Sequence, residues 1–150
     1  MSRSKKIIPP VYFLVTVVIM AGLHYFAPIG NVLHPPATYS GALFIAIGFI
    51  IMIWSAALFG KAGTPIKPFE DSTHLVIEGM YQVTRNPMYL GMVVILFGIA
   101  LLFGTLAPFI PIPIFVWLLQ TTFISNEEIA LEKTFGGEYR EYKARVRRWL

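Results

Sequence analysis

The chain is organised around one short polar stretch, Tyr81-Gln82-Val83-Thr84-Arg85-Asn86-Pro87-Met88-Tyr89-Leu90-Gly91. Residues 7–60 before it contain no Asp, Glu, Lys or Arg, and neither do residues 86–126, which begin within it. A lone arginine, a proline and two tyrosines therefore stand at the border between two long uncharged blocks. This arrangement indicates a polar site at the edge of a membrane.

The composition places the chain among integral membrane proteins. Hydrophobic residues make up 56% of the 150 positions and charged residues only 13%, whereas a soluble domain has about 25% charged residues. A crossing of the hydrocarbon core takes about 20 apolar residues, so each uncharged block has room for two. We expect an all-α fold with four transmembrane helices, at about 8–27, 38–59, 87–106 and 111–133.

The charged residues predict the orientation of these helices. In a four-helix topology all twelve basic residues fall on one side, which by the positive-inside rule is the cytoplasm and holds both termini. The eight acidic residues fall on the same side. Topology and anionic lipid explain the net charge of +4, so we expect no nucleic-acid partner. A short chain with a basic tail suits a bacterial inner membrane. The basic residues are Arg3, Lys5, Lys6, Lys61, Lys67, Arg85, Lys133, Arg140, Lys143, Arg145, Arg147 and Arg148.

We expect one domain over residues 1–150, with a first helical hairpin at 7–60, a cytoplasmic loop at 61–86, and a second hairpin with the tail at 87–150. A loop of this length in a compact chain is usually functional or disordered, and its hydrophobic residues favour packing on the mouth of the bundle. Small residues on the second and third helices predict close helix packing in lipid. They include Gly41, Gly48, Gly91 and Gly98.

The last predicted transmembrane helix carries a polar stripe. Helical spacing aligns Gln120, Ile124, Glu127 and Leu131, with Glu128 beside them. Such a stripe, ending in two carboxylates, is expected to face the bundle interior or a water-filled cleft. The alternative is that both carboxylates are simply solvated beyond the membrane.

A break at Gly136-Gly137 precedes a basic tail with aromatic residues at helical spacing. The positions Tyr139, Tyr142, Val146 and Trp149 predict an amphipathic cytoplasmic helix. Such a helix can lie in the interface on anionic lipid, or it can close over a site. The sequence permits both.

Two blocks of the sequence resemble a known family. They are Leu75-Val76-x-x-Gly79-x-Tyr81-x-x-x-Arg85-Asn86-Pro87-x-Tyr89-x-Gly91 and Glu127-Glu128-x-x-Leu131-x-x-x-Phe135-Gly136-x-Glu138-Tyr139-x-x-Tyr142-x-x-x-Val146. In this order and separation they closely resemble the isoprenylcysteine carboxyl methyltransferases, relatives of the membrane phospholipid methyltransferases. The resemblance covers about residue 63 to the C-terminus.

The resemblance implies a fold in which the cytoplasmic helix ends and the C-terminal segment enclose S-adenosylmethionine, while a lipid-side tunnel admits an apolar substrate. It implies no metal. The cofactor contacts carried over from it are Thr73, His74, Leu75, Val76, Tyr81, Asn86, Pro87, Met88, Tyr89 and Glu127.

The chemistry of these side chains agrees with that implication. Glu127 can accept hydrogen bonds from ribose hydroxyls or an ammonium group, and the tyrosines offer aromatic faces to a cation. We take Arg85 and Glu128 as the catalytic candidates; Arg85 can pair with the cofactor carboxylate or brace one of the two glutamates. His74 has a pKa suited to a base, or it serves only in packing or backbone capping.

Three positions depart from the family pattern. Asn86 stands where many members have histidine, and Met80 where proline is common. Phe123 stands one turn before Glu127, where the carboxyl methyltransferases place an arginine that contacts substrate. The resemblance implies methyl transfer from S-adenosylmethionine to a lipophilic acceptor at the cytoplasmic membrane face, as in the carboxyl methyltransferases. Because position 123 lacks the arginine, a phospholipid amine or a small thiol is the alternative nucleophile. A non-catalytic membrane scaffold of the same fold is the third possibility.

Overall fold

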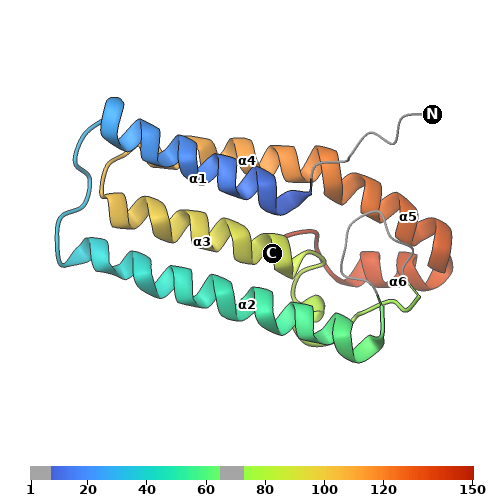
Figure 1. Cartoon of the computed structure of the whole chain (residues 1–150). Coiled ribbons are helices and arrows are strands. Elements are labelled where there is room, and N and C mark those ends of the chain that lie inside the picture. The colour runs from blue at the N-terminus through green and yellow to red at the C-terminus, as the bar shows by residue number, and fades with distance from the viewer. Residues whose placement is uncertain (1–7, 65–72) are drawn as a thin grey trace.

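The structure, a computed structural model, describes residues 8–64 and 73–150, and within these ranges the regular elements are helices. Long helical rods run side by side, and a short helix packs at one end of them (Figure 1). A π-helical turn at Gln120–Ile124 joins α4 to α5, and short 3-10 turns lie at Ala37–Tyr39, Gly79–Gln82 and Ala107–Phe109. The helices are α1 (Pro9–Phe26), α2 (Ser40–Ala62), α3 (Pro87–Phe103), α4 (Pro111–Leu119), α5 (Ser125–Phe135) and α6 (Gly137–Arg145).

Three helical segments are long and apolar enough to cross a membrane. They are Pro9–Phe26, Ala37–Ala62 and Ala107–Phe135, which confirms three of the four expected spans. The fourth, α3, is apolar but has 17 residues, because Gly104 adopts a left-handed conformation with φ of 70° and ends the helix before the predicted position 106. At about 1.5 Å per residue it is about 26 Å long, slightly less than the hydrocarbon core of about 30 Å.

The two connections without charge meet at one end of the bundle (Figure 1). The backbone amide of Val32, between α1 and α2, donates to the carbonyl of Gly104 after α3 at 2.8 Å. Leu106 donates in turn to Ile29 at 2.9 Å. The acidic and basic residues that the structure describes fall between positions 61 and 85 and between 127 and 148. Both groups lie at the end of the bundle opposite the uncharged connections. Arg3, Lys5, Lys6, Lys67, Glu70 and Asp71 lie outside the described residues.

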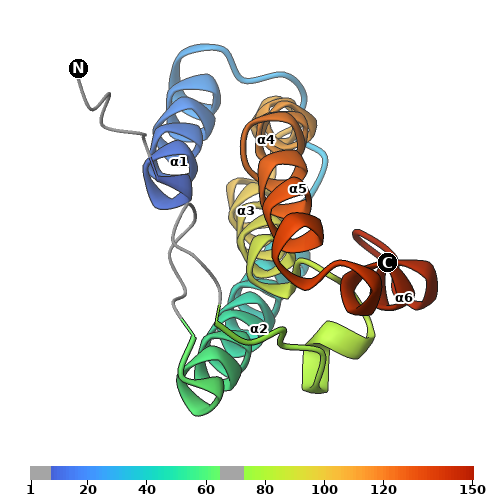
Figure 2. The same cartoon turned by 90° about the vertical axis from the view of Figure 1, so that its right-hand side faces the viewer.

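Helix α3 occupies the centre of the bundle and contacts α1, α2 and α4, as the end-on view in Figure 2 shows. Its contact with α2 is made by glycines, which belong to the small residues for which the sequence predicts close packing. A Cβ added to Gly98 would lie 2.6 Å from the carbonyl oxygen of Gly41, and one added to Gly91 would lie 2.8 Å from that of Gly48. We call these four residues the glycine seam. On its other side α3 packs on a core that includes Met20, Leu96, Phe115 and Leu119.

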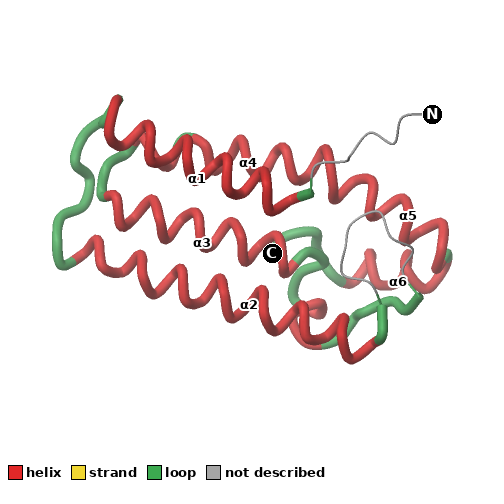
Figure 3. Tube along the Cα trace, viewed as in Figure 1, coloured by secondary structure: helices red, strands yellow, loops and turns green. Residues whose placement is uncertain are grey.

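The tail after Gly136 folds onto the protein itself. Gly136 breaks the helix with φ of 54°, as predicted, and α6 follows. Tyr139 and Tyr142 are 1% and 4% exposed and pack against Tyr81, so this apolar face contacts protein. The predicted amphipathic helix is shorter than its sequence pattern, because the backbone becomes extended at Val146. The last residues return as a loop toward the start of α3 (Figure 3).

Candidate active site at the charged end of the bundle

The entry into α3 projects two polar side chains toward α5. Asn86 is not helical, Pro87 occupies the first helical turn, where its missing N–H would have no helical partner, and the helix then runs on through Tyr89. Arg85 lies just before this turn and contacts Glu128, whereas Tyr89 lies within it and contacts Glu127. The two halves of the predicted site therefore meet.

Tyr89 and Glu127 form the shortest contact between these halves. The hydroxyl of Tyr89, which is 9% exposed, donates to Oε1 of Glu127 at 2.6 Å. Among the described residues, no hydrogen bond reaches Oε2 of Glu127. This second oxygen is therefore free to accept from another donor. A half-buried carboxylate with one oxygen free is suited to binding an ammonium group or a pair of hydroxyls.

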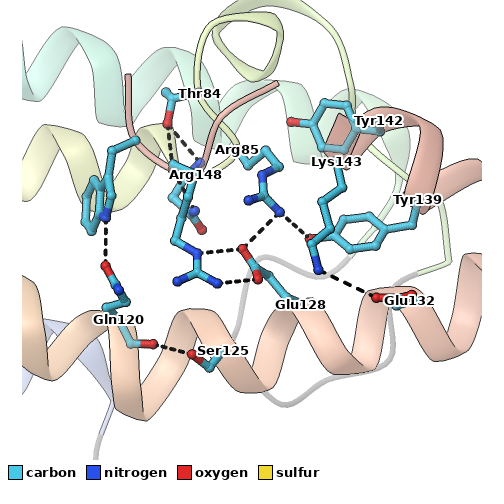
Figure 4. Close-up of polar contacts among 12 residues, drawn as sticks. Thr84, Arg85, Gln120, Ser125, Glu128, Glu132, Tyr139, Tyr142, Lys143 and Arg148 are labelled. Atoms are coloured by element: carbon cyan, nitrogen blue, oxygen red, sulfur yellow. Dashed lines mark hydrogen bonds and ion pairs between the residues drawn. The ribbon is translucent and has the colours of Figure 1, made fainter. Parts of the chain in front are cut away.

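Glu128 lies between two arginines (Figure 4). Arg148 binds both of its oxygens, with Nε at 2.9 Å and Nη2 at 2.6 Å, and Nη1 of Arg85 lies 3.0 Å from Oε1. Of the roles left open for Arg85, the structure shows the bracing of Glu128. The side chains of Arg85 and Glu128 are 10% and 8% exposed. Nε of Arg85 is buried without a hydrogen-bond partner among the described residues.

The C-terminal residues complete this polar layer. The carbonyl of Arg147 accepts from the backbone amide of Arg85 at 2.9 Å. The carbonyl of Arg148 accepts from the Thr84 hydroxyl at 3.1 Å and from the side-chain amide of Asn86 at 2.9 Å. These contacts bind the end of the chain to the segment that leads into α3.

Tyrosines hold the 3-10 turn Gly79–Gln82 against α6. The hydroxyl of Tyr142 donates to the carbonyl of Tyr81 at 2.6 Å, and Tyr139 accepts from Arg85 Nη1 at 3.3 Å. Burial raises the pKa of Tyr81, and its neighbours Tyr142 and Glu127 raise it further. Tyr81 thus stays a neutral side chain near Glu127, between the polar layer and the preceding loop.

The remaining predicted cofactor contacts lie in that loop. Thr73 and His74 are exposed and paired locally, since Thr73 donates its amide to the Thr64 hydroxyl at 3.1 Å and its own hydroxyl lies 3.2 Å from Nδ1 of His74. Leu75 and Val76 pack with Tyr81 and help to line a cavity of about 240 Å³. The other lining residues are Leu58, Lys61, Ala62, Ile77 and Glu78.

The structure thus brings some of the predicted site residues together and places others away from them. Around the start of α3 and α5 it gathers Tyr81, Tyr89, Asn86 and Glu127 with Arg85 and Glu128, and with Pro87 and Met88 in the helical turn itself. Within the described ranges no hydrogen bond joins Thr73 or His74 to Tyr89 or Glu127. Of this loop segment, Leu75 and Val76 reach the group through Tyr81.

Sequence reasoning missed Arg148 as part of the site. The tail reads as a continuous amphipathic helix, in which Arg148 is one of five basic residues. Phe123, one of the departures from the resemblance, is fully buried and packs edge-on against Tyr12 with ring centroids 5.4 Å apart. A cluster of three or more His, Cys, Asp or Glu residues able to hold a metal is absent from the described residues.

Comparisons with known proteins identify the family. The profile of the family described as phospholipid methyltransferase matches residues 36–138. A probable protein-S-isoprenylcysteine O-methyltransferase of Oryza sativa is 26% identical over 73% of this chain, and protein-S-isoprenylcysteine O-methyltransferase B of Arabidopsis thaliana is 30% identical over 71%. An uncharacterized protein of Haemophilus influenzae is 41% identical over 42% of this chain and is matched along its full length.

The alignments cover 58% of the rice relative and 55% of the Arabidopsis relative, so the chain spans little more than half their length. No solved structure gives a significant match. The helices long and apolar enough to cross a membrane agree with a membrane-bound member of such a family. The chain belongs to the phospholipid methyltransferase family and is related to the isoprenylcysteine carboxyl methyltransferases.

Proposed function

We propose that the protein transfers a methyl group from S-adenosylmethionine to a lipophilic acceptor at the charged end of the bundle. The observation that carries this proposal is the bond of 2.6 Å between Tyr89 and Glu127. It joins the two sequence blocks that resemble methyltransferases at a point where an apolar bundle meets a polar layer.

The residues present fit the charges of S-adenosylmethionine. Its amino-acid end carries an ammonium and a carboxylate, and its ribose carries two hydroxyls. Glu127 has an oxygen free to accept from the ammonium or the hydroxyls. The partnerless Nε of Arg85 is a buried donor, for which an anionic group is the natural ligand. The site thus offers both an acceptor and a donor.

The residues that would hold the cofactor are Glu127, Tyr89 and Tyr81, with the turn Asn86–Met88 and the loop segment 73–76 at its margins. When bound, the cofactor supplies an activated methyl group on a positively charged sulfur. The protein's contribution is then to hold the acceptor atom in line with that group and to exclude water. Positioning of this kind can contribute up to about 7–11 kcal/mol.

The protonation needs of the acceptor restrict what the protein must do. A carboxylate or thiolate nucleophile requires no base, whereas an amine must lose a proton. Both oxygens of Glu128 are already bound by arginines, so we assign Glu128 to orienting the site, whereas Arg85 both orients it through Nη1 and offers Nε to an anionic group. His74 is exposed on the loop and is the candidate base for an amine acceptor. The named relatives act on isoprenylcysteine, and a lipid carboxylate is accordingly our first candidate acceptor.

We further propose that the charged end faces the cytoplasm of a bacterial cell, with α3 as the fourth crossing and both termini inside. Seven basic residues among the described part of that end support this orientation, since the uncharged connections occupy the other end. They are Lys61, Arg85, Lys133, Arg140, Lys143, Arg145 and Arg147, and Arg148 adds to them within the polar layer.

Calorimetric titration of S-adenosylmethionine into the detergent-solubilised protein tests the proposal. We expect binding to the wild type, and a loss of about 10-fold to 150-fold in affinity for Glu127→Gln, because a charge-assisted hydrogen bond contributes about 1.5–3 kcal/mol. The matched control is Glu132→Gln, which removes the same charge from a half-exposed position on α5 and should leave the affinity unchanged.

Two outcomes decide among the functions. Absence of binding to the wild type would overturn the enzyme proposal and leave a membrane scaffold. If binding is present, transfer of a labelled methyl group into membrane extracts, followed by mild base treatment, separates an ester of a carboxylate from a methylated amine or thiol.

A further inference from the structure

The last residues of the chain form a strap, Arg147–Trp149, across the polar layer. Their carbonyls bind the segment before α3 through Thr84, Arg85 and Asn86, at 3.1, 2.9 and 2.9 Å. On the other side Nε1 of Trp149 donates to Oε1 of Gln120 at 3.2 Å. The strap therefore connects the start of α3 with the π-helical turn that precedes α5 (Figure 4).

Arg148 makes the strongest contact of this strap. Its guanidinium binds both oxygens of the buried Glu128 at 2.9 and 2.6 Å, a paired geometry that fixes direction as well as distance. Glu128 in turn holds Arg85 at 3.0 Å. One carboxylate thus links a residue of the strap to a residue at the entry of α3.

The neighbours of these two residues form the contact on which cofactor binding depends. Glu127 precedes Glu128 in the chain, and Arg85 lies two residues before the start of α3, the helix that carries Tyr89 in its first turn. Fixing Glu128 and Arg85 therefore fixes the backbones that carry the Tyr89–Glu127 bond. We propose that Arg148 is a positioning residue, which through Glu128 holds Tyr89 and Glu127 in their binding geometry. This role rests on the proposed function.

The geometry requires arginine in particular. A lysine at position 148 would carry the same charge but would bind as a single point, since its ammonium cannot form two parallel bonds to one carboxylate. The neighbouring Arg147 offers a control, because its side chain is exposed and it contributes its backbone carbonyl to the strap. Arg147→Ala removes the same charge and the same side chain from the adjacent position.

The experiment compares the S-adenosylmethionine affinity of Arg148→Ala, Arg148→Lys and Arg147→Ala by calorimetry in detergent. We expect Arg148→Ala to weaken binding at least 10-fold, Arg148→Lys to fall between it and the wild type, and Arg147→Ala to stay within 2-fold. Hydrogen exchange of the backbone at 84–86 and 146–149 should rise in Arg148→Ala while the exchange of α2 remains unchanged.

A double substitution tests the route through Glu128. If Arg148 acts through this carboxylate, adding Arg148→Ala to Glu128→Gln should weaken binding by less than 2-fold further. An undiminished 10-fold effect in that background would overturn the route. Should Arg148→Ala fail to fold, Arg148→Lys against Arg147→Lys carries the same comparison with the charge retained.

The two proposals fail in different ways. If the wild type binds S-adenosylmethionine and Arg148→Ala binds it as tightly as Arg147→Ala does, the positioning role is overturned and the proposed function stands. If the wild type does not bind it, both are overturned, because there is then no cofactor site for Arg148 to position.

Discussion

Helix α3 is held by close backbone packing on one side and by polar contacts on the other. Against α2 it packs through the glycine seam, where backbones approach so closely that an added Cβ would lie 2.6 Å from the Gly41 carbonyl oxygen. Against α5 it is held by Tyr89 and Arg85, which reach Glu127 and Glu128 at 2.6 and 3.0 Å. The glycine seam has no room for an extra atom, while the polar layer depends on every charge that it contains.

This difference separates close packing from ligand binding along a single helix. The seam depends on close packing of small residues, as is usual for helix pairs in lipid, and it places α3 without offering any group to a ligand. The polar layer holds charges away from water, which is costly unless each charge is paired. A layer of this kind is the part of the molecule where binding of a charged cofactor is expected.

The largest effect should come from removing the acid at the centre of the polar layer. Glu128→Ala leaves the buried Arg85 without its counter-ion, and breaking a buried ion pair typically costs about 3–5 kcal/mol. The free energy of unfolding, measured by denaturant titration in mild detergent, should fall by that amount.

The matched control is Glu132→Ala on the same helix. Glu132 pairs with Lys143 at 3.7 Å, and both side chains are about 40% exposed, at 38% and 41%. Exposed pairs contribute about 0–1 kcal/mol. Equal effects of the two substitutions would show that the polar layer is solvated in the membrane protein and would remove the contrast with the seam.

A smaller loss is expected from adding one methyl group to the seam. In Gly98→Ala the new Cβ would lie 2.6 Å from the Gly41 carbonyl and 2.9 Å from the backbone nitrogen of Ile45, so the helices must separate. Overpacking of this kind costs about 1–3 kcal/mol. The same denaturant titration measures it.

Gly22→Ala in α1 provides the comparison, because nothing lies within 4 Å of the added Cβ. Here the helix propensity of alanine should stabilise the fold by about 0.5–1 kcal/mol. A destabilisation of similar size in both variants would mean that the close approach of α2 and α3 does not contribute to stability.

The helices and the small residues of the seam could be predicted from local sequence, but the pairing of α2 with α3 through them could not. Uncharged runs bounded by proline and glycine set the helix positions to within a few residues, and the spacing of Gly91 and Gly98 gave their shared face. The end of α3 was misplaced by three residues, because a left-handed Gly104 gave no signal distinct from the glycines within the helix.

Only those residues of the polar layer that belong to the two family-like sequence blocks were predicted. Resemblance of the two blocks predicted that Glu127 and the segment Arg85–Tyr89 converge. The strap could not be predicted, because Arg148 reaches Glu128 through an extended backbone after Val146, whereas the aromatic spacing of the tail continues a helical pattern to Trp149. The π-helical turn at Gln120–Ile124 likewise has no local signature.

The smallest effect should come from the uncharged end, and it tests whether binding is confined to the polar layer. Nδ1 of His24 and the buried hydroxyl of Thr105 lie 2.9 Å apart. Thr105→Val removes that hydrogen bond without changing the shape of the side chain and should cost about 0.5–1.5 kcal/mol. Thr134→Val, which removes an exposed hydroxyl on α5 bonded within its own helix, should cost less.

Because the bond of His24 lies at the far end of the bundle from Glu127, the affinity for S-adenosylmethionine should be unchanged in Thr105→Val. A weaker affinity in this variant would show that the two ends of the bundle are coupled through α3, and that the separation of packing from binding along this helix does not hold.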